Sequence, residues 1–182
     1  MNKSVSSYHP VEIANVFVSK FSENRQRLYL SDLLKYCYLS QGFSLSKTGN
    51  PIIKGLAERW MSGPVFPVIY KEFHTQGIFV KQMASIPPPY SFRINSSKLP
   101  DLSSVEKGII DEIYNKYSNM TSIEFLGVYD KMCRDISLRS SITLYKKIPN
   151  KLIRQIFDQE LGRSIVWYKY IEIIFFSFIK LI

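Results

Sequence analysis

Residues 58–73 read ERWMSGPVFPVIYKEF and are the least generic stretch of the chain. Trp60 and Met61 end an apolar run, and residues 62–64 (SGP) follow them. Because glycine tolerates positive φ and proline has no N–H, we expect the preceding helix to end here. Pro67 then suits the first turn of a new helix. The apolar residues that follow it at helical spacing are Val68, Ile69, Tyr70 and Phe73. The sequence therefore predicts a rigid corner between two packed segments.

This corner has two interpretations. It could serve packing alone, since tryptophan and tyrosine are usually packing residues. It could instead shape a recognition surface, because aromatic anchors commonly dominate protein interfaces. On the second interpretation, the residues expected to contact a partner are Trp60, Gly63, Pro64, Tyr70 and Phe73.

Length and composition are typical of one globular domain with a substantial core. The chain has 182 residues, of which 46% are hydrophobic and 14% aromatic, and this composition argues against disorder. The formal net charge is +9. A surface this basic could face nucleic acid, an acidic protein or anionic lipid, or it could have no special partner.

The sequence offers little catalytic chemistry. Cys37 and Cys133 are far apart and His9 and His74 are scattered, so neither pair makes a convincing metal site. No phosphate-binding loop, dinucleotide fingerprint, zinc-protease motif or nucleophile elbow is present in the sequence. We therefore expect a protein that is not an enzyme and that has no cofactor or metal. The first 20 residues hold no apolar signal-peptide core, so we expect a cytoplasmic location.

Hydrophobic periodicity predicts a mainly α fold, a compact single-domain helical bundle. A short β-like hairpin could lie near residues 78–95, where proline-rich sequence interrupts the helices. We expect Ser31 to cap the second helix, Gly49 to end it, and Ser103 with Glu106 to form a capping box. The expected helices span residues 11–20, 30–48, 67–76, 102–117, 122–135 and 151–160.

The end of the chain is unusual. Residues 164–182 read SIVWYKYIEIIFFSFIKLI, an apolar run that Lys169, Glu172 and Lys180 interrupt. We divide the chain into a helical domain over residues 1–160 and an apolar helix or tail over residues 161–182. A last core helix, a partner-binding or interfacial helix, and a poor membrane anchor all remain open for this tail.

Taken together, residues 11–78 resemble the Panacea domain of SocA-like antitoxins. Residues 35–43 (KYCYLSQGF) resemble that family's Lys-Leu-Leu-Tyr-Tyr-Ala-Gln-Gly-Trp helix, and residues 48–52 (TGNPI) resemble its Thr-Gly-Lys-Pro-Leu turn. Residues 57–70 resemble its Ala-Trp-x-x-Gly-Pro-Val-x-Pro-x-x-Tyr signature, with one additional residue before Trp60. Residues 127–130 (GVYD) and those after them lack the family's Thr-His and Pro-Trp pairs.

This resemblance implies a helical, cytoplasmic antitoxin that silences a cognate toxin by direct binding. It also implies, for SocA-like members, an adaptor role that delivers the toxin to protease machinery. Two alternatives stay open. One is a nucleic-acid-binding regulator that uses the basic region over residues 131–151. The other is a membrane-associated effector or phage-type protein that uses the C-terminal tail.

Overall fold

The structure is a computed structural model that describes residues 7–84, 99–139 and 142–162, with residues 133–139 described by their backbone alone. Helices dominate it, which confirms the mainly α prediction. The elements in chain order are α1 (Pro10–Glu23), α2 (Leu30–Thr48), β1 (Glu58–Trp60), β2 (Gly63–Val65), α3 (Pro67–Phe73), the 3-10 turn η1 (His74–Gln76), α4 (Ser104–Tyr117) and α5 (Ser122–Arg139). A last helix covers residues 150–162.

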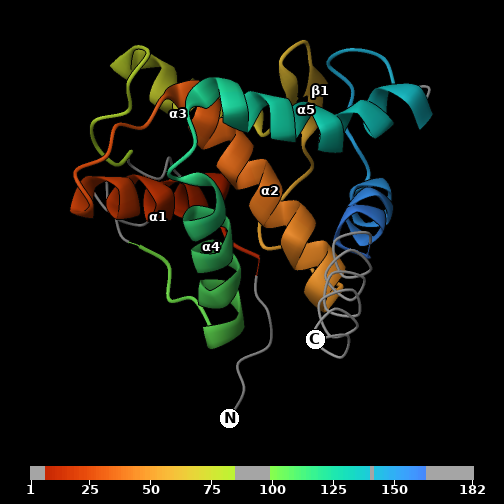
Figure 1. The fold of residues 1–182 in the computed structure, drawn as a ribbon, viewed down its shortest axis with the longest axis horizontal. Helices are drawn as coiled ribbons and strands as arrows, with labels where there is room; N and C mark the ends of the chain where they lie inside the picture. The colour runs from red at the N-terminus through yellow and green to blue at the C-terminus, as the bar shows by residue number, and fades with distance from the viewer. Residues whose placement is uncertain (1–6, 85–98, 140–141, 163–182) are drawn as a thin grey trace, which may run out of the picture.

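Helix α2 runs through the middle of the fold, and the other elements surround it (Figure 1). Every residue from Asp32 to Leu45 is buried. Helices α1, α3, α4 and α5 and strand β2 all contact α2. A helix with apolar residues nearly all round has to lie inside the domain, and α2 does.

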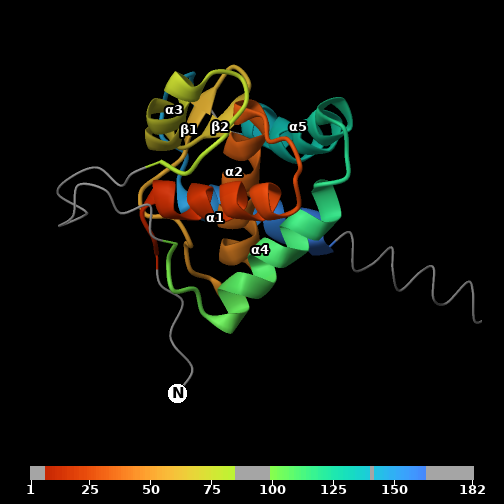
Figure 2. The ribbon, with the colours of Figure 1, turned by 90° about the vertical axis from the view of Figure 1, so that its left-hand side faces the viewer.

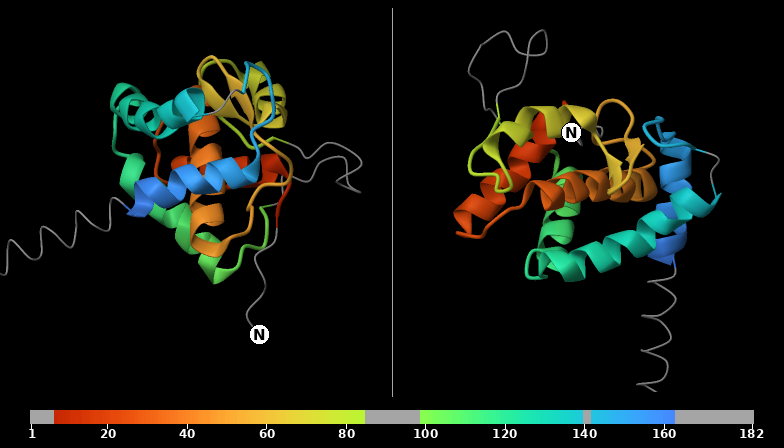
Figure 3. Two further views of the ribbon diagram at one scale, coloured as in Figure 1. Left: turned by 90° about the vertical axis from the view of Figure 1, so that its right-hand side faces the viewer. Right: turned by 90° about the horizontal axis from the view of Figure 1, so that it is seen from above.

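The last helix packs across α2 at Gln41 and Gly42 (Figure 3). The Gln41 side chain accepts a hydrogen bond from the Ile53 N–H at 2.9 Å and donates one to the Asn150 side chain at 3.1 Å. Phe157 lies against Gly42 and makes an edge contact with Phe43, with ring centroids 5.9 Å apart. The Gln-Gly-Phe part of α2 therefore contacts two distant segments, the one at Ile53 and the last helix.

Helix ends follow the sequence signals with one exception. The capping box of Ser103 and Glu106 is present, and Gly49 ends α2 with a left-handed φ of 77°. Ser31 does not cap α2, because the helix already begins at Leu30 with Tyr29 as its N-cap. The reason is a distant pairing, since the Leu30 N–H donates to the Ile78 carbonyl at 2.9 Å and fixes the chain just before the helix.

The corner is a β-hairpin and not the end of a helix, which corrects the sequence interpretation of residues 52–60. Strands β1 and β2 pair antiparallel, with Glu58 opposite Val65 and Trp60 opposite Gly63. The outer edge of β1 pairs with residues 145–147 through two backbone hydrogen bonds at Arg59. This long-range pairing stabilises the extended backbone of β1. The residues around β1 in the sequence hold no signal that predicts the pairing.

The small hairpin thus lies at residues 58–65, upstream of the predicted range of 78–95. Residues 28–30 and 78–80 are joined by an isolated antiparallel bridge between Tyr29 and Phe79. The rest of the predicted hairpin, residues 85–98, lies outside the described residues, as do residues 163–182 of the tail. Within the described ranges, no helix is long and apolar enough to cross a membrane.

Candidate functional site: an apolar groove beside the hairpin

A groove of about 550 Å³ lies between the first half of α2, the β1–β2 hairpin, α3 and the start of α5. We call it the apolar groove. Figure 2 shows α3, the hairpin and α5 gathered around one end of α2. Three of the five predicted contact residues line the groove, namely Trp60, Pro64 and Tyr70. Distant parts of the chain therefore complete the surface that the corner begins.

Several aliphatic side chains of the groove are exposed. Ile123 is 83% exposed, Ile78 is 73% exposed, and Leu126 and Tyr70 are about 40% exposed. Isolated exposed apolar residues are ordinary on a protein surface, but a group of them around one concave site is typical of a protein-binding surface. The groove can accept an apolar side chain or helix face from a partner.

Tyr129 of α5 holds the turn of the hairpin in place. Its hydroxyl donates a hydrogen bond to the Pro64 carbonyl at 2.8 Å. Gly63 has a φ of 104°, and a β-carbon there would come within 2.7 Å of the Tyr129 ring. A side chain at residue 63 would thus block the close approach of α5, which accounts for the glycine on structural grounds.

Four aromatic rings form a row along the hairpin side of the groove. Trp60 lies edge to face with Tyr70 at 5.4 Å between ring centroids, and with Tyr145 at 6.1 Å. His74 stacks on the other side of Tyr70 at 5.4 Å. Tyr145 is 62% exposed, so the row reaches from the groove to open surface. We call these four residues the aromatic row.

Phe73 does not belong to this surface. Its side chain is completely buried in the core, so it supports α3 from below and has no area to offer a partner. The helical spacing that groups Phe73 with Tyr70 is too coarse to separate them, since they lie on the inner and outer sides of a short helix.

A buried ion pair within α2 lies at the wall of the groove, and the first residue of α5 contacts it. The Lys35 ammonium contacts the Asp32 carboxylate at 2.9 Å, and the Ser122 hydroxyl donates to the same carboxylate at 2.6 Å. Asp32 and Lys35 are both 7% exposed. Breaking this pair would leave a buried charge without compensation. The hydrogen bond of Ser122 ties the start of α5 to it.

A negative charge is fixed beside Ile123 in the first turn of α5. The Thr121 N–H and hydroxyl each donate to the Glu124 carboxylate at 2.8 Å. These hydrogen bonds, the backbone one first, lower the pKa of Glu124. The carboxylate is thus held ionised at the positive end of the helix dipole, next to an apolar contact residue.

Sequence reasoning missed Ile78, Ile123, Leu126 and Tyr145. The sequence held a signal for Ile123 and Leu126. In the part of α5 whose side chains are described, the buried stripe consists of Phe125, Tyr129 and Met132. Ile123 and Leu126 are apolar residues off that stripe, and an amphipathic helix does not need them for its own packing. Ile78 and Tyr145 join the site through distant pairings, for which a single sequence holds no local signal.

Other candidate chemistry is sparse. Among the described residues, no group of three or more potential ligands could hold a metal ion. Of the basic region, the four lysines Lys131, Lys146, Lys147 and Lys151 are exposed. The side chains of Arg134 and Arg139 lie outside the described set. These lysines are on three different segments and do not surround a common pocket.

Comparison with known proteins identifies the family. No curated protein and no solved structure matches the chain. The sequence model of the family described as "Antitoxin SocA-like, Panacea domain" matches residues 33–130, more than half of the chain. That region includes all but the first three residues of α2, the hairpin, α3, α4 and the first half of α5, and so contains most of the groove. The chain belongs to the SocA-like antitoxin family defined by the Panacea domain.

Proposed function

We propose that this protein is an antitoxin without catalytic activity that neutralises a cognate toxin by binding it directly through the apolar groove. Family membership supports an antitoxin-like role in general terms. The single observation that supports the groove as the contact surface is the exposure of Ile123 and Ile78 at its rim. Two large aliphatic side chains left in water at one concave site are what a partner would cover.

Burying one exposed isoleucine completely contributes roughly 1.5–3 kcal/mol. Ile123 and Ile78 therefore offer a partner several kcal/mol before any hydrogen bond is formed. The aromatic row adds rigid contact area whose side chains are already ordered by one another, which lowers the entropy lost on binding. An amphipathic helix of the toxin is the simplest shape that fits an apolar groove of this kind.

The experiment is co-expression with the product of the neighbouring reading frame. The proposal predicts that the neighbour alone arrests growth, that this chain restores growth, and that the two proteins co-purify. A toxic neighbour that is neither bound nor neutralised would contradict the proposal. Following the amount of toxin over time in the same cells would test the adaptor role, which stays a prediction.

A further inference from the structure

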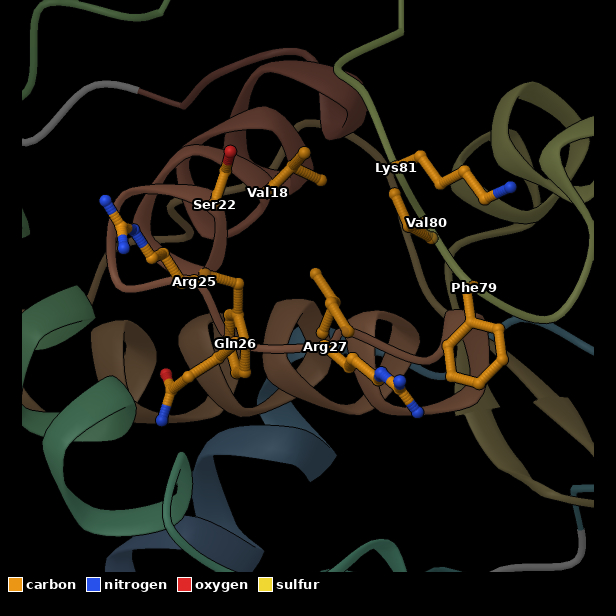
Figure 4. A pocket seen from close by; sticks show the side chains of 10 residues that line it. Val18, Ser22, Arg25, Gln26, Arg27, Phe79, Val80 and Lys81 are labelled. Carbon is orange, nitrogen blue, oxygen red and sulfur yellow. The ribbon is translucent and has the colours of Figure 1, made fainter.

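A second pocket, separate from the apolar groove, lies between the end of α1 and the paired segments 25–28 and 79–81. Its volume is about 540 Å³, within the range of roughly 300–1,000 Å³ that is usual for small-molecule sites. No residue lines both this pocket and the apolar groove. We call it the basic pocket. Figure 4 shows it from close by.

Its floor is apolar and its rim is cationic. Phe21, Leu28 and Val80 form the floor and are 3–8% exposed. Arg25, Arg27 and Lys81 are exposed around it. In Figure 4, Arg25 and Lys81 lie on opposite sides of the pocket, and the Arg27 guanidinium points toward the Phe79 ring. That guanidinium lies 5.8 Å from the centroid of the ring, which holds it in place by a cation–π contact.

The backbone pairs the two segments that carry Arg27 and Lys81. The Val80 N–H donates to the Leu28 carbonyl at 2.9 Å, and the bridge between Tyr29 and Phe79 continues the same antiparallel pairing. In that register Arg27 lies across from Lys81. The pairing brings two cationic residues to one edge of the pocket. Their charged ends lie apart in Figure 4, and such long side chains can turn toward a bound anion.

No carboxylate of the described residues compensates these charges. None of Arg25, Arg27 and Lys81 takes part in an ion pair within the described ranges. The nearest acidic residue in sequence is Glu23, which does not line the pocket and accepts a hydrogen bond from the Ser19 hydroxyl at 2.6 Å. Another lining residue, Gln26, is held in place because its side chain accepts a hydrogen bond from the Tyr114 hydroxyl at 2.6 Å.

From these features we propose that the basic pocket binds a nucleoside phosphate, either free or as a unit of a nucleic-acid strand. The phosphate lies between Arg27 and Lys81, where the guanidinium can donate two parallel hydrogen bonds to its oxygens. The base lies over the apolar floor. Arg25 reaches a neighbouring phosphate from the other side of the pocket. This site shares no lining residue with the apolar groove, so the proposal for it is tested separately from toxin binding.

The test compares two double variants of the full-length chain. Arg27→Ala with Lys81→Ala removes two positive charges from the pocket. Lys54→Ala with Lys107→Ala removes two exposed positive charges elsewhere and is the matched control. The probes are a fluorescein-labelled single-stranded RNA oligonucleotide, followed by anisotropy, and ATP, followed by its effect on the melting temperature. Measurements are made near physiological salt, where nonspecific phosphate contacts weaken.

We expect the pocket variant to bind the oligonucleotide at least about tenfold more weakly than the wild type, and the control variant to stay within about threefold. Binding of ATP as well as the oligonucleotide would identify the free nucleotide as a ligand, whereas binding of the oligonucleotide alone would identify the strand. Equal weakening in both double variants would leave only nonspecific charge attraction and would overturn the proposal. So would the absence of binding by the wild type to both probes.

Folding of the pocket variant is checked by its melting temperature without ligand. Because both side chains are exposed and the cation–π contact of Arg27 is the main contact removed, we expect a value close to that of the wild type. If the melting temperature of the pocket variant is lower, oligonucleotide binding is compared instead between the single variants Lys81→Gln and Lys107→Gln. Lys81→Gln removes an exposed charge and changes little else. Loss of binding in Lys81→Gln alone would then support the site, and equal binding of both would overturn it.

Discussion

The ring of Phe157 lies directly over Gly42 of α2, so that a β-carbon at residue 42 would come within 2.4 Å of three ring atoms. A rigid ring at that distance has to move, and with it the last helix, which Gln41 also ties to α2. We therefore expect Gly42→Ala to lower the free energy of unfolding by about 1–3 kcal/mol, as overpacking of a core usually does. Urea denaturation followed by circular dichroism would measure the change.

Gly108→Ala is the control for this substitution. Gly108 lies inside α4, and a β-carbon there would meet no atom within 4 Å. Alanine is the better helix former, so we expect this variant to gain up to about 1 kcal/mol. Equal effects of the two alanine substitutions, in size and in sign, would contradict the close approach of Phe157 to α2.

The hydrogen bond from Tyr129 to the Pro64 carbonyl carries a second prediction. Tyr129→Phe keeps the ring that covers Gly63 but leaves a buried carbonyl without this donor. We expect a loss of about 1–3 kcal/mol in unfolding free energy, the usual cost of an unsatisfied buried group. Tyr145→Phe, at a ring that is 62% exposed, should change stability by less than about 0.5 kcal/mol. A neutral Tyr129→Phe would mean that the hairpin does not depend on this bond.

His9 makes stability depend on pH. Its Nδ1 accepts a hydrogen bond from the Val11 N–H at 3.3 Å and so caps α1. Burial lowers its pKa below the ordinary value of 6.5, and Lys54 acts in the same direction, whereas Glu12 and Glu72 act against it. The unfolded chain therefore binds this proton more readily, and His9 contributes stability above pH 6.5 that is lost as the pH falls.

His9→Asn isolates this effect, because asparagine also caps helices well but does not titrate. Between about pH 7.5 and 5.5 we expect the wild type to lose stability relative to His9→Asn by up to about 1 kcal/mol. Thermal unfolding at several pH values would measure the difference. Parallel pH profiles for the two proteins would show that the proton on His9 does not matter.

Local sequence rules predicted most of the helices and their ends. The periodicity of α1, α2 and α4, the capping box at Ser103 and the left-handed Gly49 depend on neighbours a few residues away, and the structure agrees with each. The misplaced N-cap at Ser31 and the expected helix before Trp60 are errors of another kind. Both segments are held by pairing with distant residues, Ile78 in one case and residues 145–147 in the other.

The candidate site was likewise predicted where it depends on local sequence and missed where it depends on distant pairing. Trp60 and Tyr70 were predicted from the signature of the corner, and both line the groove. Phe73 was assigned to the same surface but is core, because aromatic type does not reveal which side of a short helix faces out. The most exposed part of the groove, Ile123, comes from a helix about sixty residues later in the chain, and only the fold brings it beside the hairpin.

The most direct test of the account is the affinity of the cognate toxin for Ile123→Asp and Val105→Asp. Both isoleucine and valine are exposed, at 83% and 52%, and each occupies the second position of its helix, where an acidic residue is favourable. Neither substitution should therefore lower the melting temperature. The account predicts that Ile123→Asp weakens toxin binding by at least about tenfold while Val105→Asp binds as the wild type does. Wild-type affinity in Ile123→Asp would contradict the assignment of the groove as the toxin-binding surface.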